Sequence, residues 1–460
     1  MSYPPQYPYD PAGWQAPAMA PPPAAPREPL DLRVVAAFVA IPVIVLLDSF
    51  VWFGMSSVYS RYLTDTYQGG LGLEFSVYGE VREWQLLAMM CATVFGGILA
   101  IGLGPRFTMV LGLLVCGAGV VATGLLGGVS LYAPAIVVAI GQGIYRPSVY
   151  GAAAEVLPFP RGQLRNVLFV VIYVTLNLGA ALSSWLTWKL TEVTSFQAIF
   201  MAMAAALFLA AIVGLLLAFA HLFLGPSQHG GESEPSAGVP PTLPTTRRLD
   251  PRFIAVGLGL IVVTAIPWMS FGLMWELQFT AAEHLGTDLT YTSWFFSLNP
   301  LIVIFVGLLL AAVLLVLHLT RIRIPTLLLV GLGLMVMGAG MAALLLCFVV
   351  QQPPLLLLSV AVIAAGEVLM APLLASRIAG DQHGRLVTLM TALWLAASYG
   401  SSQLLSHLGL HDSGALQLLG GIVAAVCVVV GLGLAIAAYP LRKVLTPAPE
   451  PPPPGTPLPY

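Results

Sequence analysis

Twelve long apolar segments dominate this chain, and they restrict it to a fold that places most of its residues in a lipid bilayer. Only 8% of the 460 residues are charged and 58% are hydrophobic, whereas a soluble globular protein has about 25% charged residues. About 20 apolar residues in a helix span the hydrocarbon core, so each segment predicts one transmembrane helix. The predicted spans are residues 33–62, 82–103, 106–129, 132–157, 164–189, 196–224, 252–282, 290–319, 324–350, 354–379, 384–409 and 414–440.

A polar segment divides these spans into two groups of six. Residues 225–250 are rich in Gly, Pro, Ser and Thr and interrupt the apolar pattern, which is typical of a linker. The sequence therefore predicts an all-α polytopic membrane protein with two six-helix bundles around a central cavity. The expected parts are a Pro-rich tail (1–32), a first bundle (33–224), the linker (225–250), a second bundle (251–444) and a second Pro-rich tail (445–460). Both tails are expected to be disordered and solvated, and binding of protein partners by them is the alternative.

The distribution of basic residues predicts how the chain is oriented in the membrane. Of the 18 Lys and Arg residues, 14 fall at one set of span ends. The opposite set holds only Arg61, Arg82 and Lys189. Because positive charge concentrates on the cytoplasmic side, we expect both termini and the linker in the cytoplasm of a plasma or inner membrane. The N-terminal region lacks an early apolar run, so no cleavable signal peptide is expected.

Three charged residues, Arg146, Glu276 and Glu367, lie inside long apolar segments. A charge at the centre of a membrane helix costs roughly 2.5–3.5 kcal/mol on insertion scales. One basic and two acidic residues at such positions indicate a polar cavity within the membrane. A carrier for a small-molecule substrate has such a cavity, whereas a passive anchor does not need one.

Several other classes of function find no support in the sequence. A net charge of −2 gives no indication of nucleic-acid binding. No nucleophile–base cluster or nucleotide-binding glycine loop occurs in a polar context, so an enzyme is not expected. The four cysteines stand singly and no histidine pair has ligand spacing, so we expect no metal and no other cofactor.

Five segments resemble the proton-coupled oligopeptide transporters of the major facilitator superfamily. That family has Gly-x-Gly-x-x-Lys-Pro in its fourth span, Tyr-x-x-x-Asn-Leu-Gly in the fifth, Ser-Leu-Asn-Pro in the eighth, and Glu followed by Pro in the tenth. The matching segments here are GQGIYRPSVYGAAAEVL (141–157), FVVIYVTLNLGAAL (169–182), SWFFSLNPLIVIF (293–305), GEVLMAPLLASRIA (366–379) and TALWLAASYG (391–400). The resemblance implies the major facilitator fold, with peptides as substrates and protons as the coupling ion.

The resemblance also implies roles for single residues. Arg146 matches a lysine that engages the substrate carboxylate, and Glu367 matches the acid that receives the substrate amino group. A zwitterion requires one fixed cation and one fixed anion, which this pair would supply. The residues expected to line the rest of the site are Asn177, Asn299, Tyr173, Trp394 and Trp52. Helix-to-helix hydrogen bonding by the two asparagines, and an ion pair of Arg146 with Glu155, are the alternatives.

The first span departs from the family's Glu-x-x-Glu-Arg-Phe-x-Tyr-Tyr-Gly. The same frame here reads VLLDSFVWFG (45–54), in which Asp48 shortens the second acid and Ser49 replaces the arginine. Trp52 and Phe53 replace the two tyrosines, and Ser56 replaces a further basic residue. These replacements predict that Arg146 is the only basic residue in the N-terminal half of the cavity.

Proton coupling is expected to involve Glu276, Asp48 and Glu367. Glu276 resembles the family's seventh-span acid, and the loss of the basic residue at Ser56 would leave it without its partner. The alternative is that Glu276 extends its carboxylate to the outer interface. Two further interpretations of the protein stay open: a major facilitator carrier of a more apolar solute, and a transport-inactive relative that serves as a sensor or scaffold.

Overall fold

The computed structural model describes residues 32–67, 69–126, 130–157, 162–219, 251–286, 289–380, 386–407 and 413–445. The predicted linker and almost all of both predicted tails lie outside these residues. Leu32 and Leu445 are the exceptions, because they are the first residue of the first helix and the last residue of the last helix.

Twelve helices and no strand occur in the described residues, which confirms the predicted all-α fold. The first half of the chain holds α1 (Leu32–Thr64), α2 (Phe75–Leu103), α3 (Pro105–Leu126), α4 (Tyr132–Val156), α5 (Gly162–Val193) and α6 (Phe196–Ala218). The second half holds α8 (Pro251–His284), α9 (Leu289–Leu319), α10 (Thr326–Val350), α11 (Pro353–Gly380), α12 (Leu386–His407) and α13 (Ser413–Leu445).

Ten of the helices are long and apolar enough to cross a membrane, and α4 and α12 are the two that fall short. Helix α4 is enclosed by its neighbours: every residue from Gly141 to Ala154 is buried except Arg146, which is half-buried. A helix that other helices shield from lipid can carry polar and small side chains. In α12 the apolar stretch is the shorter run Leu386–Ser401.

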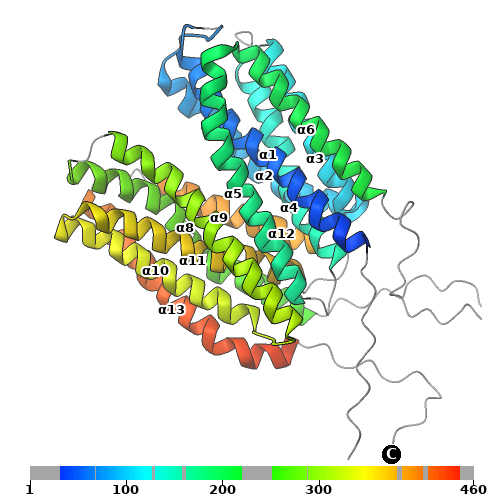
Figure 1. Cartoon of the computed structure of the whole chain (residues 1–460), viewed down its shortest axis with the longest axis vertical. Helices are drawn as coiled ribbons and strands as arrows, with labels where there is room; N and C mark the ends of the chain where they lie inside the picture. Colours follow the sequence, from blue (N-terminus) through cyan, green and yellow to red (C-terminus); the bar gives the residue numbers. More distant parts are fainter. Residues whose placement is uncertain are drawn as a thin grey trace, which may run out of the picture.

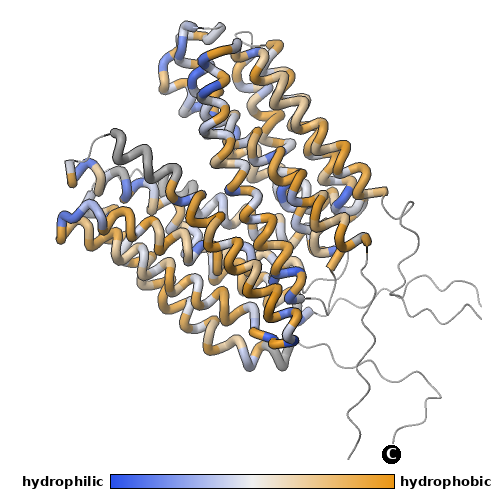
Figure 2. Tube along the Cα trace, viewed as in Figure 1, coloured by the Kyte–Doolittle hydropathy of each residue, from blue (hydrophilic) through white to orange (hydrophobic). Residues whose placement is uncertain are grey.

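Each half forms a bundle of its own. In the first half α1 packs against α5 and α6, while α4 packs against α2 and α3. In the second half α10 packs against α11 and α13, and α8 packs against α12 and α13. The two bundles converge at one end and diverge at the other end (Figure 1). Hydrophobic residues predominate along the helices, as a bilayer requires (Figure 2).

Glycines allow α3 and α4 to approach closely. A Cβ atom at Gly141 would lie 2.3 Å from the backbone nitrogen of Cys116, and one at Gly112 would lie 2.6 Å from the backbone nitrogen of Tyr145. Such contacts are too short for any side chain, so both helices need glycine here. This packing fixes the position of the segment of α4 that carries Arg146.

The substitution Gly141→Ala is therefore expected to destabilise the protein by about 1–3 kcal/mol, because the new methyl group overpacks a backbone contact. The measurement is the Tm of the purified protein in detergent. Gly433→Ala is the matched control, since nothing lies within 4 Å of a Cβ built at that helical glycine. Equal Tm values for the two variants would contradict the close packing of α3 on α4.

Candidate functional site

Arg146 is the centre of a hydrogen-bonded chain that joins the two halves. It lies on α4, and its Nε donates to Oε1 of Gln142 at 3.1 Å, one helical turn earlier. Its Nη1 donates to the hydroxyl of Tyr399 on α12 at 3.0 Å. The Nε2 of Gln142 in turn donates to Oδ1 of Asp48 on α1 at 2.5 Å. One amide therefore links a buried carboxylate to a guanidinium, and the guanidinium reaches across to the second half.

Gln142 was not among the residues that the sequence singled out. It lies four residues before Arg146 on the same helix, a spacing that brings two side chains together on one helix face. That spacing was the only available signal, because the partner Asp48 is 94 residues away in the chain. Glutamine is suited to the position because its amide donates to one neighbour and accepts from the other.

A small pocket lies beside this chain, with a volume of about 50 Å³. One water needs roughly 10–15 Å³ by the same kind of measure, so the pocket has room for a few waters or one small chemical group. Its polar wall is made by Asp48, Ser49 and Arg146, with tyrosines and aliphatic residues around them. The remaining lining residues are Val45, Tyr145, Val149, Tyr150, Ile172, Leu176, Leu395 and Tyr399.

Glu367 forms a second polar cluster. Its carboxylate lies buried on α11 and accepts hydrogen bonds from the hydroxyl of Tyr173 on α5 and from Nδ2 of Asn299 on α9, the latter at 3.3 Å. Among the described residues the carboxylate has no basic partner. The structure thus brings together three residues that the sequence assigned to one site, and it draws them from both halves of the chain.

Two of the three remaining predicted lining residues, Asn177 and Trp394, lie outside this cluster. Asn177 donates from Nδ2 to the backbone oxygen of Tyr173 on its own helix at 3.0 Å, which leaves its side-chain oxygen available. Trp394 packs edge-on against Tyr150 and Trp268, with ring centroids 6.2 and 5.6 Å apart. Its buried indole nitrogen has no hydrogen-bond partner among the described residues. Because Tyr150 also lines the 50 Å³ pocket, Trp394 lies directly behind the pocket wall.

Trp52 contacts two arginines rather than one. The guanidinium carbon of Arg146 lies 4.9 Å from the Trp52 ring centroid, and that of Arg82 lies 5.1 Å from the same centroid. Arg82 was expected at a helix end, but α2 begins at Phe75 and not near residue 82, so that Arg82 lies two turns inside the helix. Among the described residues that line the 50 Å³ pocket, Arg146 is the basic one, and its being the only basic residue in the N-terminal half of the cavity stays a prediction.

Glu276 stands apart from both clusters. It is exposed on α8, and its side chain forms no hydrogen bond or ion pair with any residue in the described ranges. Its predicted part in proton coupling stays a prediction. The alternative ion pair of Arg146 with Glu155 was wrong, because Glu155 pairs with Arg106 at 3.3 Å.

A hydrogen-bond network joins the two halves at the end of the molecule that the sequence predicts to be cytoplasmic. In this network an arginine donates to uncharged acceptors. Arg165 on α5 donates to Ser376 Oγ at 3.4 Å and to the backbone oxygen of Gly380 at 3.4 Å, both on α11. Ser376 donates to Oδ1 of Asn166 at 2.6 Å, and Asn166 Nδ2 donates to Thr326 Oγ1 on α10 at 3.0 Å. We call Arg165, Asn166, Thr326 and Ser376 the latch, since they tie one half to the other.

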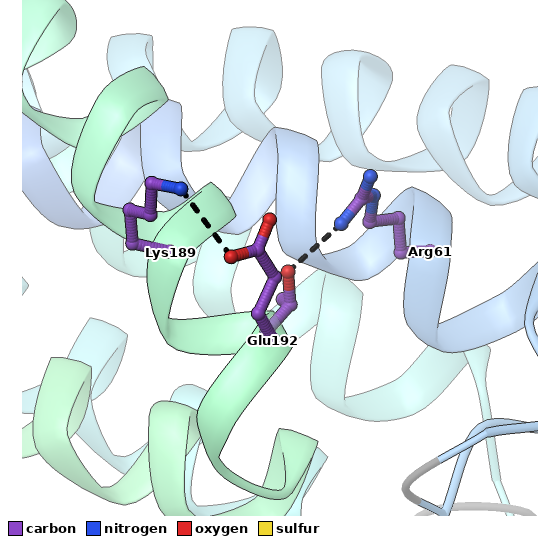
Figure 3. A network of polar contacts seen from close by, with 4 residues as sticks. Arg61, Lys189 and Glu192 are labelled. Carbon is purple, nitrogen blue, oxygen red and sulfur yellow. Dashed lines mark hydrogen bonds and ion pairs between the residues drawn. The ribbon is translucent and has the colours of Figure 1, made fainter.

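At the opposite end the polar contacts found among the described residues lie within one half or the other. Arg61 on α1 donates to Thr191 on α5 at 2.8 Å, and Lys189 pairs with Glu192 at 3.4 Å (Figure 3). On the second half, His284 bonds to Gln351 at 3.2 Å. The halves are thus joined at the latch end and diverge at the other, and the two polar clusters lie between them.

The fold has well-characterised counterparts among solved structures. No protein-family model matches the sequence, and no curated protein matches it. A proton:xylose symporter of the major facilitator superfamily, XylE, is similar with a TM-score of 0.61 at 13% identity, over 89% of this chain and 96% of that one. A peptide transporter of the POT family in complex with sulfate is similar with a TM-score of 0.53 at 19% identity, over 89% and 95%. A bacterial homologue of the human drug peptide transporters PepT1 and PepT2 gives 0.54 at 14% identity, over 90% and 100%.

These similarities extend over almost the full length of each chain, with both bundles included. The chain therefore has the fold of the major facilitator superfamily, and it is a multi-pass membrane protein. Identities of this size establish the fold alone.

Proposed function

We propose that the protein is a secondary active transporter that works by alternating access. The observation that carries the proposal is the placement of two buried polar clusters, one with Arg146 and one with Glu367, between halves that are tied together at one end. A solute would enter from the end at which the halves diverge and leave after the latch opens and the other end closes. We further propose a plasma or inner membrane location with both termini in the cytoplasm, so that entry is from outside.

The proposed solute is a small zwitterion such as a di- or tripeptide. Arg146 would bind its carboxylate, since a guanidinium offers a fork of donors that fits a carboxylate. Glu367 would accept its amino group in place of the hydrogen bonds that Tyr173 and Asn299 now donate. Similar POT-family structures hold compatible ligands: one is a complex with 5-aminolevulinic acid, which has an amine at one end and a carboxyl group at the other.

The proposed coupling ion is the proton. Asp48 and Glu367 are carboxylates that the fold buries without an ion pair in the described residues. A buried carboxylate is costly unless a cation or a proton neutralises it. Glu367 would be neutralised alternately by a proton and by the solute's ammonium group. This alternation would couple the movement of protons across the membrane to that of the solute.

Uptake into liposomes tests this function. Purified protein is reconstituted, and uptake of di- and tri-alanine is followed under an inward proton gradient, with Glu367→Gln as the matched variant. We expect concentrative uptake by the wild type and a loss of at least tenfold in the variant, because the amide can neither bind an ammonium group by charge nor release a proton. Wild-type uptake equal to that of empty liposomes would contradict peptide–proton symport.

A carrier of a more apolar solute is the second candidate. The observation in its favour is the pocket wall, where the five aliphatic residues outnumber Asp48, Ser49 and Arg146. The aliphatic residues are Val45, Val149, Ile172, Leu176 and Leu395. This candidate predicts that an apolar solute binds the Glu367→Gln variant as tightly as the wild type, whereas the zwitterion proposal predicts weaker binding.

A further inference from the structure

Among the described residues, Arg82 is a cation without a counter-charge. It lies half-buried on α2, and its guanidinium forms no ion pair with a carboxylate in the described part of the chain. Its recorded partner is the ring of Trp52, which Arg146 also contacts. The guanidinium carbons of Arg82 and Arg146 lie 5.1 and 4.9 Å from the same ring centroid, so they are no more than about 10 Å apart. At such a separation like charges repel each other.

The charges around Trp52 do not balance. Asp48 is the acidic residue of the hydrogen-bonded chain, and Gln142 directs it toward Arg146. Arg82 has no such carboxylate linked to it among the described residues. Two guanidinium groups on one ring with one carboxylate leave an excess of positive charge beside Trp52. An anion supplied from outside the chain would neutralise that excess.

The side chains around Arg82 also favour an anion from outside the chain as its partner. A small hollow of about 10 Å³ contains Arg82 together with Trp52, Tyr59, Tyr78 and Gln85. The other polar side chains there already serve the backbone: Tyr59 donates to the Leu131 oxygen at 3.0 Å, Tyr78 to the Ser56 oxygen at 3.3 Å, and Gln85 to the Ala135 oxygen at 3.4 Å. Arg82 is thus the polar side chain of this hollow without a hydrogen-bond acceptor among the described residues. Because about 10 Å³ holds at most one water, an anion would contact the guanidinium on the part of Arg82 that is exposed.

We propose that Arg82 forms a second anion-binding subsite, and that the protein prefers solutes with two anionic groups, one for each arginine on Trp52. This inference rests on the proposed transport function and makes its substrate class narrower. An extended solute covers about 3.3–3.6 Å per residue, so a molecule of two or three residues with an acidic side chain can reach both guanidinium groups. The indole of Trp52 is the shared apolar surface between them.

Binding of a dicarboxylate and a monocarboxylate to the purified full-length protein tests the proposal without any need for transport. The probes are glutarate and butyrate at equal ionic strength, with binding followed by the change in Tm. We expect glutarate to bind the wild type at least tenfold more tightly than butyrate, because two charge-assisted contacts replace one. Arg82→Gln should remove that difference. Arg61→Gln is the matched control, an arginine of the same end that bonds to Thr191 and not to Trp52, and it should keep the difference.

Two results would overturn the proposal. One is equal binding of glutarate and butyrate by the wild type, and the other is an undiminished preference in Arg82→Gln. If Arg82→Gln does not fold, Arg82→Lys decides, since lysine keeps the charge and loses the fork: glutarate binding weakened at least threefold supports the subsite, and unchanged binding excludes it. Failure of peptide uptake in liposomes leaves this assay unaffected, so the two proposals can fail separately.

Discussion

Replacing Arg146 with Gln is expected to abolish uptake of any anionic or zwitterionic solute and to destabilise the protein. The substitution removes the guanidinium that bonds to Gln142 and Tyr399. It also leaves Asp48 buried beside an amide and without the nearby positive charge. Removing one partner of a buried charge pair typically costs about 3–5 kcal/mol. Because an amide separates the two charges here, we expect the lower part of that range, measured as a fall in Tm together with the loss of uptake in liposomes.

Two further variants separate stability from function. Tyr399→Phe removes a single hydrogen bond from Arg146 and should cost about 0.5–1.5 kcal/mol with uptake largely retained. The double variant Asp48→Asn/Arg146→Gln removes both charges and should recover most of the lost stability, yet remain unable to transport. Recovery of uptake in the double variant would contradict the assignment of Arg146 as the residue that binds the solute.

Replacing Arg165 with Ala is expected to open the latch end and to shift the protein toward the opposite conformation. The side chain donates across the halves to Ser376 and to the Gly380 backbone. Hydrogen bonds from charged donors contribute about 1.5–3 kcal/mol each, and 1.4 kcal/mol changes a conformational equilibrium tenfold. The two hydrogen bonds together therefore correspond to a shift of about two to four orders of magnitude in the ratio of the two states.

The shift can be measured by the distance between spin labels placed at Gly102 and Arg323, which are exposed near this end on α2 and just after α9. We expect a longer distance in Arg165→Ala than in the wild type. Arg106→Ala is the matched control, because Arg106 pairs with Glu155 inside one half and should leave the distance unchanged. An unchanged distance in Arg165→Ala would show that the latch does not hold the halves together.

The sequence predicted the fold well because the requirement for apolar spans is strong and local. Ten helices meet that requirement directly. Helix ends were predicted less well: α2 begins at Phe75, since a helix can continue beyond the apolar stretch into the interface, where polar residues are tolerated. Because α2 begins earlier than predicted, Arg82 lies within the helix and over the ring of Trp52, and not at a helix end.

The site was only partly predictable. Glu367, Tyr173 and Asn299 stand out as polar residues in apolar spans, and the structure brings them together. Gln142 offers only its spacing of four residues from Arg146, because its partner Asp48 lies 94 residues away. The latch residues Arg165 and Ser376 carry no local signal, since they lie 211 residues apart. Such pairs arise from the packing of helices that are distant in sequence. No local pattern reports them.

Alternating access at Arg146 requires that the protein carry a small solute across the membrane in both directions. Exchange transport in liposomes tests it most directly: liposomes are loaded with unlabelled dialanine, and entry of labelled dialanine is measured without any proton gradient. We predict saturable entry that internal dialanine accelerates several-fold, and its loss in Arg146→Gln. Alternating access at Arg146 would be contradicted if dialanine, trialanine and an acidic dipeptide all entered no faster than they enter empty liposomes.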